Sequence, residues 1–188
     1  WKHDGKGVNV IVIREVNDNL IESGEFRMLS KSYWRNDENA LAVTDGVRLG
    51  TMLGKKLQVR NDEKSTKYNR LASGKIDKRL IAELGFGNDS VFHKVMIDRY
   101  SPTILHISVD ASGSMSGDKW RNAQRATIAI AKAASMVQNL NVVISYRSTE
   151  EIGNKNTPAI FIAYDSRKDK INKISNLFKY ISCPGVTP

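Results

Sequence analysis

The chain has 188 residues, of which 40% are hydrophobic, so it can bury a core in one or two small domains. Its 29 Lys and Arg exceed its 20 Asp and Glu, and the net charge of +9 fits nucleic acid, an acidic partner or a solvated basic surface. No apolar stretch is long enough for a membrane span, no secretory signal is visible, and the single cysteine, Cys183, excludes an internal disulfide. We therefore expect a cytoplasmic protein.

The first part of the chain contains a predicted strand and a long predicted helix. Valines alternate with other residues over 7–13, which indicates a short strand, and no clean period follows over 14–34. Residues 36–57 predict a helix of about six turns, because acidic residues begin it and apolar residues share one face. Within it, glycines recur at every fourth position, which leaves one stripe free of side chains. We expect another helix to pack closely against Gly46, Gly50 and Gly54.

A basic segment over 55–79 follows this helix. Its candidate contacts with nucleic acid or an acidic partner are Lys55, Lys56, Arg60, Lys64, Lys67 and Arg70. Tyr68 is its only aromatic residue, which argues against a base-stacking surface. A turn at 73–75, a short helix over 78–84 closed by glycine, and a strand over 91–97 are predicted next.

An oxygen-rich loop follows the apolar strand predicted over 104–109. Asp110, Ser112 and Ser114 alternate with small residues, so one carboxylate and two hydroxyls can point into one space. Hard oxygen ligands of this kind suit Mg²⁺ or Mn²⁺. With one formal negative charge among the ligands, the metal would keep a position for an acidic group from another molecule. We therefore expect a docking site rather than a reaction centre.

The serine cluster has three other interpretations. A flexible linker would not stand between a buried strand and an amphipathic helix. The nucleophile elbow of a serine hydrolase needs a serine midway between its two glycines, and Met115 occupies that position between Gly113 and Gly117. Ser116 is predicted to cap the following helix, which is compatible with metal binding by the other two serines.

The spacing Asp-x-Ser-x-Ser after a buried strand resembles the metal-ion-dependent adhesion site of von Willebrand factor A domains. The resemblance implies an α/β fold with a doubly wound, Rossmann-like sheet and the metal beyond the carboxyl ends of its strands. It also implies a threonine ligand from a second loop, for which Thr187 is the candidate, with Met115 and Ser116 as partner contacts. A third loop normally supplies an aspartate after a later strand. No such strand follows in this chain, so we expect the sheet and the ligand set to be incomplete.

The residues after the metal loop fit the same family. An amphipathic helix over 118–140 should pack against the sheet. Strands over 141–147 and 159–164, joined by a polar connection, fit the antiparallel edge pair that the resemblance implies. A helix over 168–181 would then lead to the candidate threonine.

Four segments are similar, in the same order, to the carboxy-terminal half of the CobT subunit of aerobic cobaltochelatase: 49–57, 72–80, 91–94 and 109–117. Related von Willebrand A proteins, some encoded by bacteriophages, work with MoxR-type AAA+ ATPases. The resemblance implies a mainly helical segment over 1–100 and the first half of a von Willebrand A domain over 101–188. It also implies a non-catalytic adaptor that couples a MoxR- or CobS-type ATPase to its client and assembles only with that partner.

In this adaptor, the metal on Asp110, Ser112, Ser114 and Thr187 would capture a partner's carboxylate. The chain has no Walker motif, so ATP hydrolysis would belong to the partner. Its histidines show no ligand spacing, and nothing indicates a corrin site. Two alternatives stay open: a structural or adhesive metal-dependent protein, such as a virion or surface component, and a basic nucleic-acid-binding module.

Overall fold

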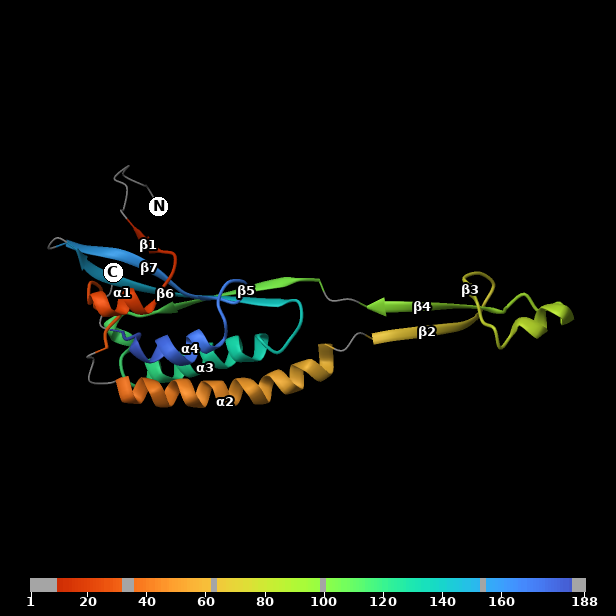
Figure 1. Ribbon diagram of the computed structural model, residues 1–188, viewed down its shortest axis with the longest axis horizontal. Coiled ribbons are helices and arrows are strands. Elements are labelled where there is room, and N and C mark those ends of the chain that lie inside the picture. Colours follow the sequence, from red (N-terminus) through yellow and green to blue (C-terminus); the bar gives the residue numbers. More distant parts are fainter. Residues whose placement is uncertain (1–9, 32–35, 62–63, 99–100, 153–154, 184–188) are drawn as a thin grey trace. The chain divides into compact units, whose positions relative to one another are not determined.

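The computed structural model describes residues 10–31, 36–61, 64–98, 101–152 and 155–183 (Figure 1). The chain divides into two compact units, which we call the main unit (Trp1–Arg60 and Pro102–Pro188) and the inserted unit (Asn61–Ser101). This grouping differs from the predicted division at residue 100. The reason is that the long helix ending at Asn61 packs against a helix that begins at Asp118.

The main unit contains a four-stranded mixed sheet in the order β1-β7-β6-β5. Its strands are β1 (Ile11–Ile13), β5 (Thr103–Asp110), β6 (Leu140–Ile152) and β7 (Lys155–Asp165). β5 is parallel to β6, β1 is parallel to β7, and β6 and β7 are antiparallel. The protein is therefore a mixed α/β fold. The strands predicted over 104–109, 141–147 and 159–164 are confirmed, as is the described end of the strand predicted over 7–13. The prediction that the strand before Asp110 is buried is wrong, because β5 is an edge strand in which Val109 alone is buried.

The position and length of β6 and β7 differ from the prediction. We expected an antiparallel pair at the edge of the sheet, joined by a polar connection over 148–158. The pair is antiparallel, but it lies at the centre because β1 pairs with β7 and β5 pairs with β6. The polar residues belong to a ladder that continues to the pair Ile152 and Lys155, so cross-strand pairing overrides their weak strand propensity.

In the described part of the chain, the α-helices are α1 (Asp18–Ser23), α2 (Asn36–Asn61), α3 (Asp118–Ala134) and α4 (Asn172–Leu177). Figure 1 shows α2, α3 and α4 on one side of the sheet. The helix predicted from residue 36 is confirmed, whereas α3 ends six residues before the predicted 140, and the chain reaches a positive φ of 65° at Asn139. Among the described helices, not one combines the length and apolar character that a membrane crossing requires.

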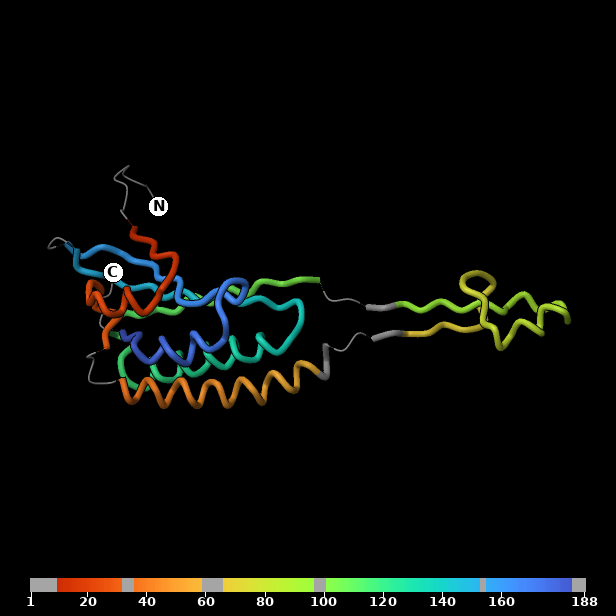
Figure 2. The backbone as a smooth tube through the Cα atoms, in the orientation of Figure 1, coloured from red at the N-terminus to blue at the C-terminus, as the bar shows by residue number. Residues whose placement is uncertain are grey.

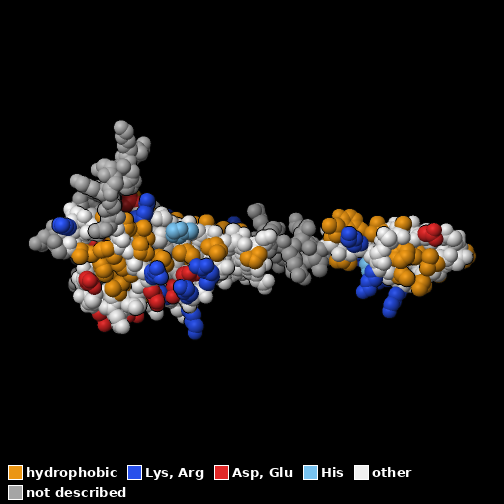
Figure 3. Space-filling model, turned by 90° about the horizontal axis from the view of Figure 1, so that it is seen from above, with side chains coloured by type: hydrophobic (Ala, Val, Ile, Leu, Met, Phe, Trp, Pro, Cys, Tyr) orange, Lys and Arg blue, Asp and Glu red, His pale blue; other side chains and the backbone are white. Residues whose placement is uncertain are grey.

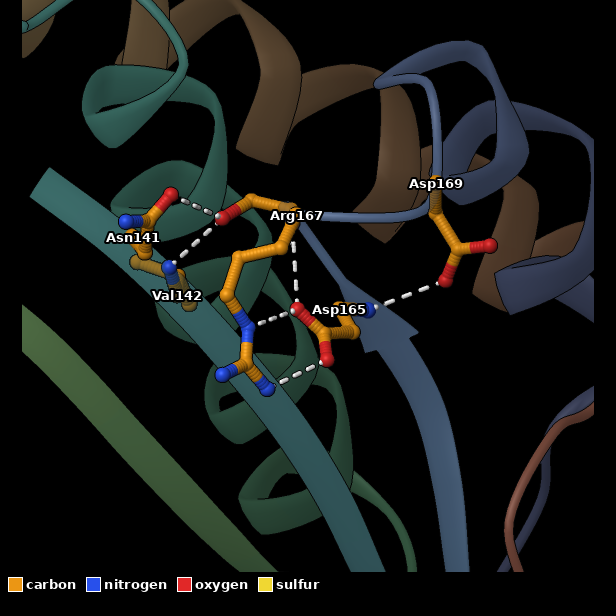
Figure 4. Close-up of polar contacts among 6 residues, drawn as sticks. Asn141, Val142, Asp165, Arg167 and Asp169 are labelled. Carbon is orange, nitrogen blue, oxygen red and sulfur yellow. Dashed lines mark hydrogen bonds and ion pairs between the residues drawn. The ribbon is translucent and has the colours of Figure 1, made fainter.

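The connection between β7 and α4 makes the last helix shorter than the predicted 168–181. The carboxylate of Asp165 accepts hydrogen bonds from the Arg167 backbone N–H at 3.0 Å and from its guanidinium at 2.9 and 2.7 Å (Figure 4). Asp169 accepts a hydrogen bond from the backbone N–H of Asp165 at 2.9 Å. These bonds hold the backbone in turns, and the side-chain hydrogen bond from Arg167 lowers the pKa of the Asp165 carboxyl.

The glycine stripe of α2 packs against α3, as predicted. A Cβ atom added at Gly46 would lie 2.9 Å from the Cβ of Ile128, and one added at Gly50 would lie 2.5 Å from the Ala129 carbonyl oxygen. At Gly54 the obstacle would be the sulfur of Met136, at 2.5 Å. The helices therefore approach so closely that a side chain on this stripe would have to displace the neighbouring helix.

The core lies between the helices and the face of the sheet that they cover. Tyr146 of β6 packs between Trp120 and Phe178, with ring centroids 5.7 and 5.9 Å apart, and burial raises its pKa. Glu150, on the same face of β6, is 1% exposed and accepts a hydrogen bond from the Arg27 backbone N–H at 2.8 Å. Desolvation raises the pKa of this carboxyl despite that bond.

The opposite face of the sheet is exposed along β5, whereas Ser145 and Thr149 of β6 are buried. Alternate residues of β5 point to it and are exposed: Ile104, His106, Ser108 and Asp110. The His106 imidazole does not stand alone, because its Nε2 lies 2.8 Å from the Ser145 hydroxyl. Figure 3 views the main unit from this side and shows hydrophobic side chains gathered beside charged ones.

The inserted unit is a small antiparallel sheet in the order β2-β4-β3. Its elements are β2 (Lys64–Leu71), β3 (Lys75–Ile76), a 3-10 helix (Ile81–Phe86) and β4 (Phe92–Asp98). Figure 2 traces the chain along β2 and back along β4. The predicted turn and the strand near 91–97 are confirmed, and the short helix predicted over 78–84 is a 3-10 helix that begins at Ile81 and ends before Gly87. Residues 64–71 and 75–76 of the basic segment are strand rather than part of a mainly helical region. Of the side chains described over 66–96, Val91 alone is buried.

Candidate functional site

Asp110 stands at the carboxyl end of β5, beside Arg147, the last residue of the strand predicted over 141–147. In the parallel register of β5 and β6, Asp110 pairs with Arg147. The backbone N–H of Ala111 then donates to the Arg147 carbonyl oxygen at 2.8 Å, so the loop starts from a fixed point. Ala111 itself is fully buried, which leaves no space there for a larger side chain.

The loop brings the three predicted ligands from β5 and the residues after it together. The Ser112 backbone N–H donates to Oδ1 of Asp110 at 2.9 Å, and the hydroxyl oxygens of Ser112 and Ser114 lie 2.9 Å apart. A 3-10 turn (Gly113–Met115) produces this approach, with the Met115 N–H donating to the Ser112 carbonyl at 3.0 Å. Ser112 is 2% exposed, whereas Ser114 faces solvent, so the cluster has a buried side and an open side.

The donor set fits a small hard cation. Neighbouring ligands of an octahedral Mg²⁺ lie about 2.9 Å apart, because each is 2.0–2.1 Å from the metal and adjacent bonds are perpendicular. The two serine oxygens already have this separation. Among the described residues, no group of three or more His, Cys, Asp or Glu side chains could hold a metal ion. A metal at Asp110 would therefore depend on the serine hydroxyls.

The other predicted site residues have different outcomes. Thr187 lies outside the described residues. Met115 is half-buried and packs against the core, so only part of it can contact a partner, while Ser116 is exposed. The prediction that Ser116 caps α3 is wrong, because Gly117 is the residue before the helix, with a positive φ of 79° that favours glycine.

The basic residues do not belong to one element. Lys55 and Lys56 lie on α2 in the main unit, while Lys67 and Arg70 lie on β2 in the inserted unit. Lys67 forms an ion pair with Asp77 at 3.4 Å, and Arg70 forms one with Glu83 at 3.3 Å. The side chains of Arg60 and Lys64 lie outside the described part. Two of these six cations are thus already paired with carboxylates of the inserted unit.

A pocket of about 340 Å³ opens beside the serine cluster. It is lined by Val10, Asp110, Ser112, Arg147, Ser148, Pro158, Ala159 and Ile160. Sequence reasoning missed Arg147 as a site residue. A signal was present, since a charged residue ends the strand predicted over 141–147, but only the register places it beside Asp110.

Comparison with protein-family models, curated proteins and solved structures gives no match to this chain. The function proposed below is therefore supported by the geometry of the loop, the topology around it and the resemblance of its motif.

Proposed function

We propose that the chain is a von Willebrand A-type adaptor that binds Mg²⁺ or Mn²⁺ and uses the metal to hold an acidic group of a partner protein. The observation that carries the proposal is the convergence of the Asp110 loop, in which the hydroxyls of Ser112 and Ser114 meet at 2.9 Å. The metal would supply a Lewis-acidic position for a carboxylate. The chain's own residues orient the ligand oxygens through the backbone bond from Ser112 to Asp110.

The topology around the loop supports this proposal. β5 is followed by the metal loop, then α3, then the parallel strand β6 and its antiparallel neighbour β7. This is the order expected for the first half of a doubly wound von Willebrand A sheet. The loop lies at the carboxyl end of β5, and open α/β sheets bind ligands beyond the carboxyl ends of their strands. β1 falls within the strand predicted over 7–13, but its pairing with β7 in this sheet was not expected.

We further propose a MoxR- or CobS-type AAA+ ATPase as the partner, with the chain as its non-catalytic adaptor for metal insertion or protein remodelling. The support is the CobT-like order of segments 49–57, 72–80, 91–94 and 109–117. These segments fall on α2, on the turn into β3, on β4 and on the metal loop, respectively. A structural or adhesive protein would use the same metal geometry. The nucleic-acid alternative is less well supported, because Lys67 and Arg70 are engaged in ion pairs.

A co-purification experiment tests the adaptor proposal. The tagged chain, expressed in the cells that naturally produce it, is expected to retain a partner in Mg²⁺ and to release it in EDTA, and the released fraction should hydrolyse ATP. Asp110→Ala should retain no such partner, while Ser108→Ala, an exposed serine on the same strand, should behave as the wild type. Partner binding that survives EDTA but is lost on adding salt would instead favour nucleic acid.

A further inference from the structure

The pocket beside the metal loop is lined by one cationic side chain, Arg147, and by several apolar side chains. Binding of the proposed metal would not require either of them. We propose that Arg147 and the apolar side chains of this pocket select the partner group, which is an Asp or Glu adjacent to a branched apolar residue. This inference rests on the proposed function, because the same carboxylate would face the metal. It adds the chemical class of the bound segment and the residues that recognise it.

Arg147 is placed to contact a carboxylate held at the loop. It pairs with Asp110 across the parallel register, and residues paired in this way project from the same face of the sheet. Arg147 is exposed, and within the described residues its guanidinium has no ion-pair partner. The planar guanidinium can donate two parallel hydrogen bonds to a carboxylate, which a lysine cannot do.

Metal binding and carboxylate binding depend on each other because of the charges at the site. A guanidinium beside a divalent cation is repelled by it, so Arg147 should weaken metal binding when no partner is present. A carboxylate bound between the two cations removes that repulsion. By linkage, the metal and the acidic ligand then increase each other's affinity by the same factor.

The apolar walls explain why a carboxylate alone would not fill the site. Val10, Pro158 and Ile160 line the pocket, and Val10 is 47% exposed. The pocket volume of about 340 Å³ falls at the lower end of the range for ligand sites, and is too large for one carboxylate group. A Val, Ile or Leu side chain next to the acid would cover these residues and remove apolar surface from water.

Labelled peptides of equal length test the inference by fluorescence anisotropy in Mg²⁺. One carries Leu-Asp at its centre, a second carries Gly-Asp and a third carries Leu-Asn. We expect the Leu-Asp peptide to bind at least about tenfold more tightly than either control. Arg147→Ala should weaken Leu-Asp binding about tenfold, and Arg147→Lys should recover only part of it. Without peptide, Arg147→Ala should bind Mn²⁺ as tightly as the wild type or more tightly.

The outcomes separate this inference from the function on which it rests. Equal binding of Leu-Asp and Gly-Asp, or wild-type binding by Arg147→Ala, would overturn the inference even if Mn²⁺ still binds at Asp110. Failure of the Leu-Asp peptide to bind in Mg²⁺ would overturn it as well. If Mn²⁺ itself does not bind, or binds equally to Asp110→Ala, the proposed function fails first.

Discussion

The loop after β7 lies beside the start of β6, and the loop after β5 lies beside its middle. Both loops contain aspartate and serine at or directly after the end of a strand, and they use these residues differently. In the loop after β7, both oxygens of Asp165 bind Arg167, and Asp169 accepts a hydrogen bond from the Asp165 backbone N–H at 2.9 Å (Figure 4). Asp169 also binds the Lys173 ammonium at 2.9 Å. Ser166 accepts a hydrogen bond from the Val142 N–H at 2.9 Å. The polar groups of this loop are thus engaged by the protein itself.

The loop after β5 leaves its oxygens available. In the described part of the chain, one oxygen of Asp110 accepts a single backbone N–H, and the hydroxyls of Ser112 and Ser114 contact each other. The comparison shows that residue types alone do not make a ligand site. Oxygens can bind a ligand when the surrounding backbone and cations do not already occupy them.

Asp110→Ala should have the largest effect of the changes that test this comparison. We expect Mn²⁺ affinity, measured by the electron paramagnetic resonance of free Mn²⁺, to fall more than about 100-fold, because the only charged ligand of the described cluster is lost. The circular dichroism spectrum should not change, since Asp110 is exposed. A folded variant that keeps wild-type Mn²⁺ affinity would contradict the metal site.

Asp165→Ala is the matched control in the loop after β7. Removing its carboxylate leaves the Arg167 backbone and guanidinium without their acceptor, so the free energy of unfolding in urea should fall by about 2 kcal/mol. Mn²⁺ affinity should stay at the wild-type value. If this variant weakened Mn²⁺ binding as strongly as Asp110→Ala while still folded, the distinction between the loops would be wrong.

Ser114→Ala should have a smaller effect on the metal. Loss of one neutral ligand is expected to lower Mn²⁺ affinity about tenfold, with a change in unfolding free energy of less than about 0.5 kcal/mol because the side chain is exposed. Ser108→Ala, on the same strand face as Asp110 but outside the cluster, provides the comparison. Equal Mn²⁺ affinities in the two serine variants would remove Ser114 from the ligand set.

The smallest expected effect is the pH dependence of the contribution that Asp165 makes to the free energy of unfolding. The hydrogen bond from Arg167 lowers the pKa of this carboxyl in the folded state, so its stabilising effect is present above the ordinary aspartate pKa. As the pH falls through the lowered value, the folded carboxyl is protonated and the contribution is lost. The stability difference between wild type and Asp165→Asn should therefore shrink between about pH 5 and pH 2. A difference that stays constant over this range would contradict the ion-pair explanation.

Local patterns predicted the elements whose structure depends on neighbouring residues in the chain. The helix from residue 36 and the strand before Asp110 were predictable because a 3.6-residue or two-residue period encodes them directly. The close packing of the glycine stripe was also predictable, since absent side chains mark a surface that another helix can approach. The prediction that Ser116 caps α3 was wrong because the residue before the helix is Gly117. Gly117 adopts a positive φ at no steric cost, a conformation that composition alone does not reveal.

Pairing between distant segments could not be predicted in the same way. The polar residues Ser148 to Glu151 form a strand only because β7 pairs with them, and the central position of β6 and β7 depends on β1, which lies more than a hundred residues earlier in the chain. The sequence by itself determined which residues carry the oxygen ligands and the order of strand, loop and helix around them. Only the tertiary structure decided that Arg147 stands beside Asp110, because strand register depends on backbone pairing between segments remote in the chain.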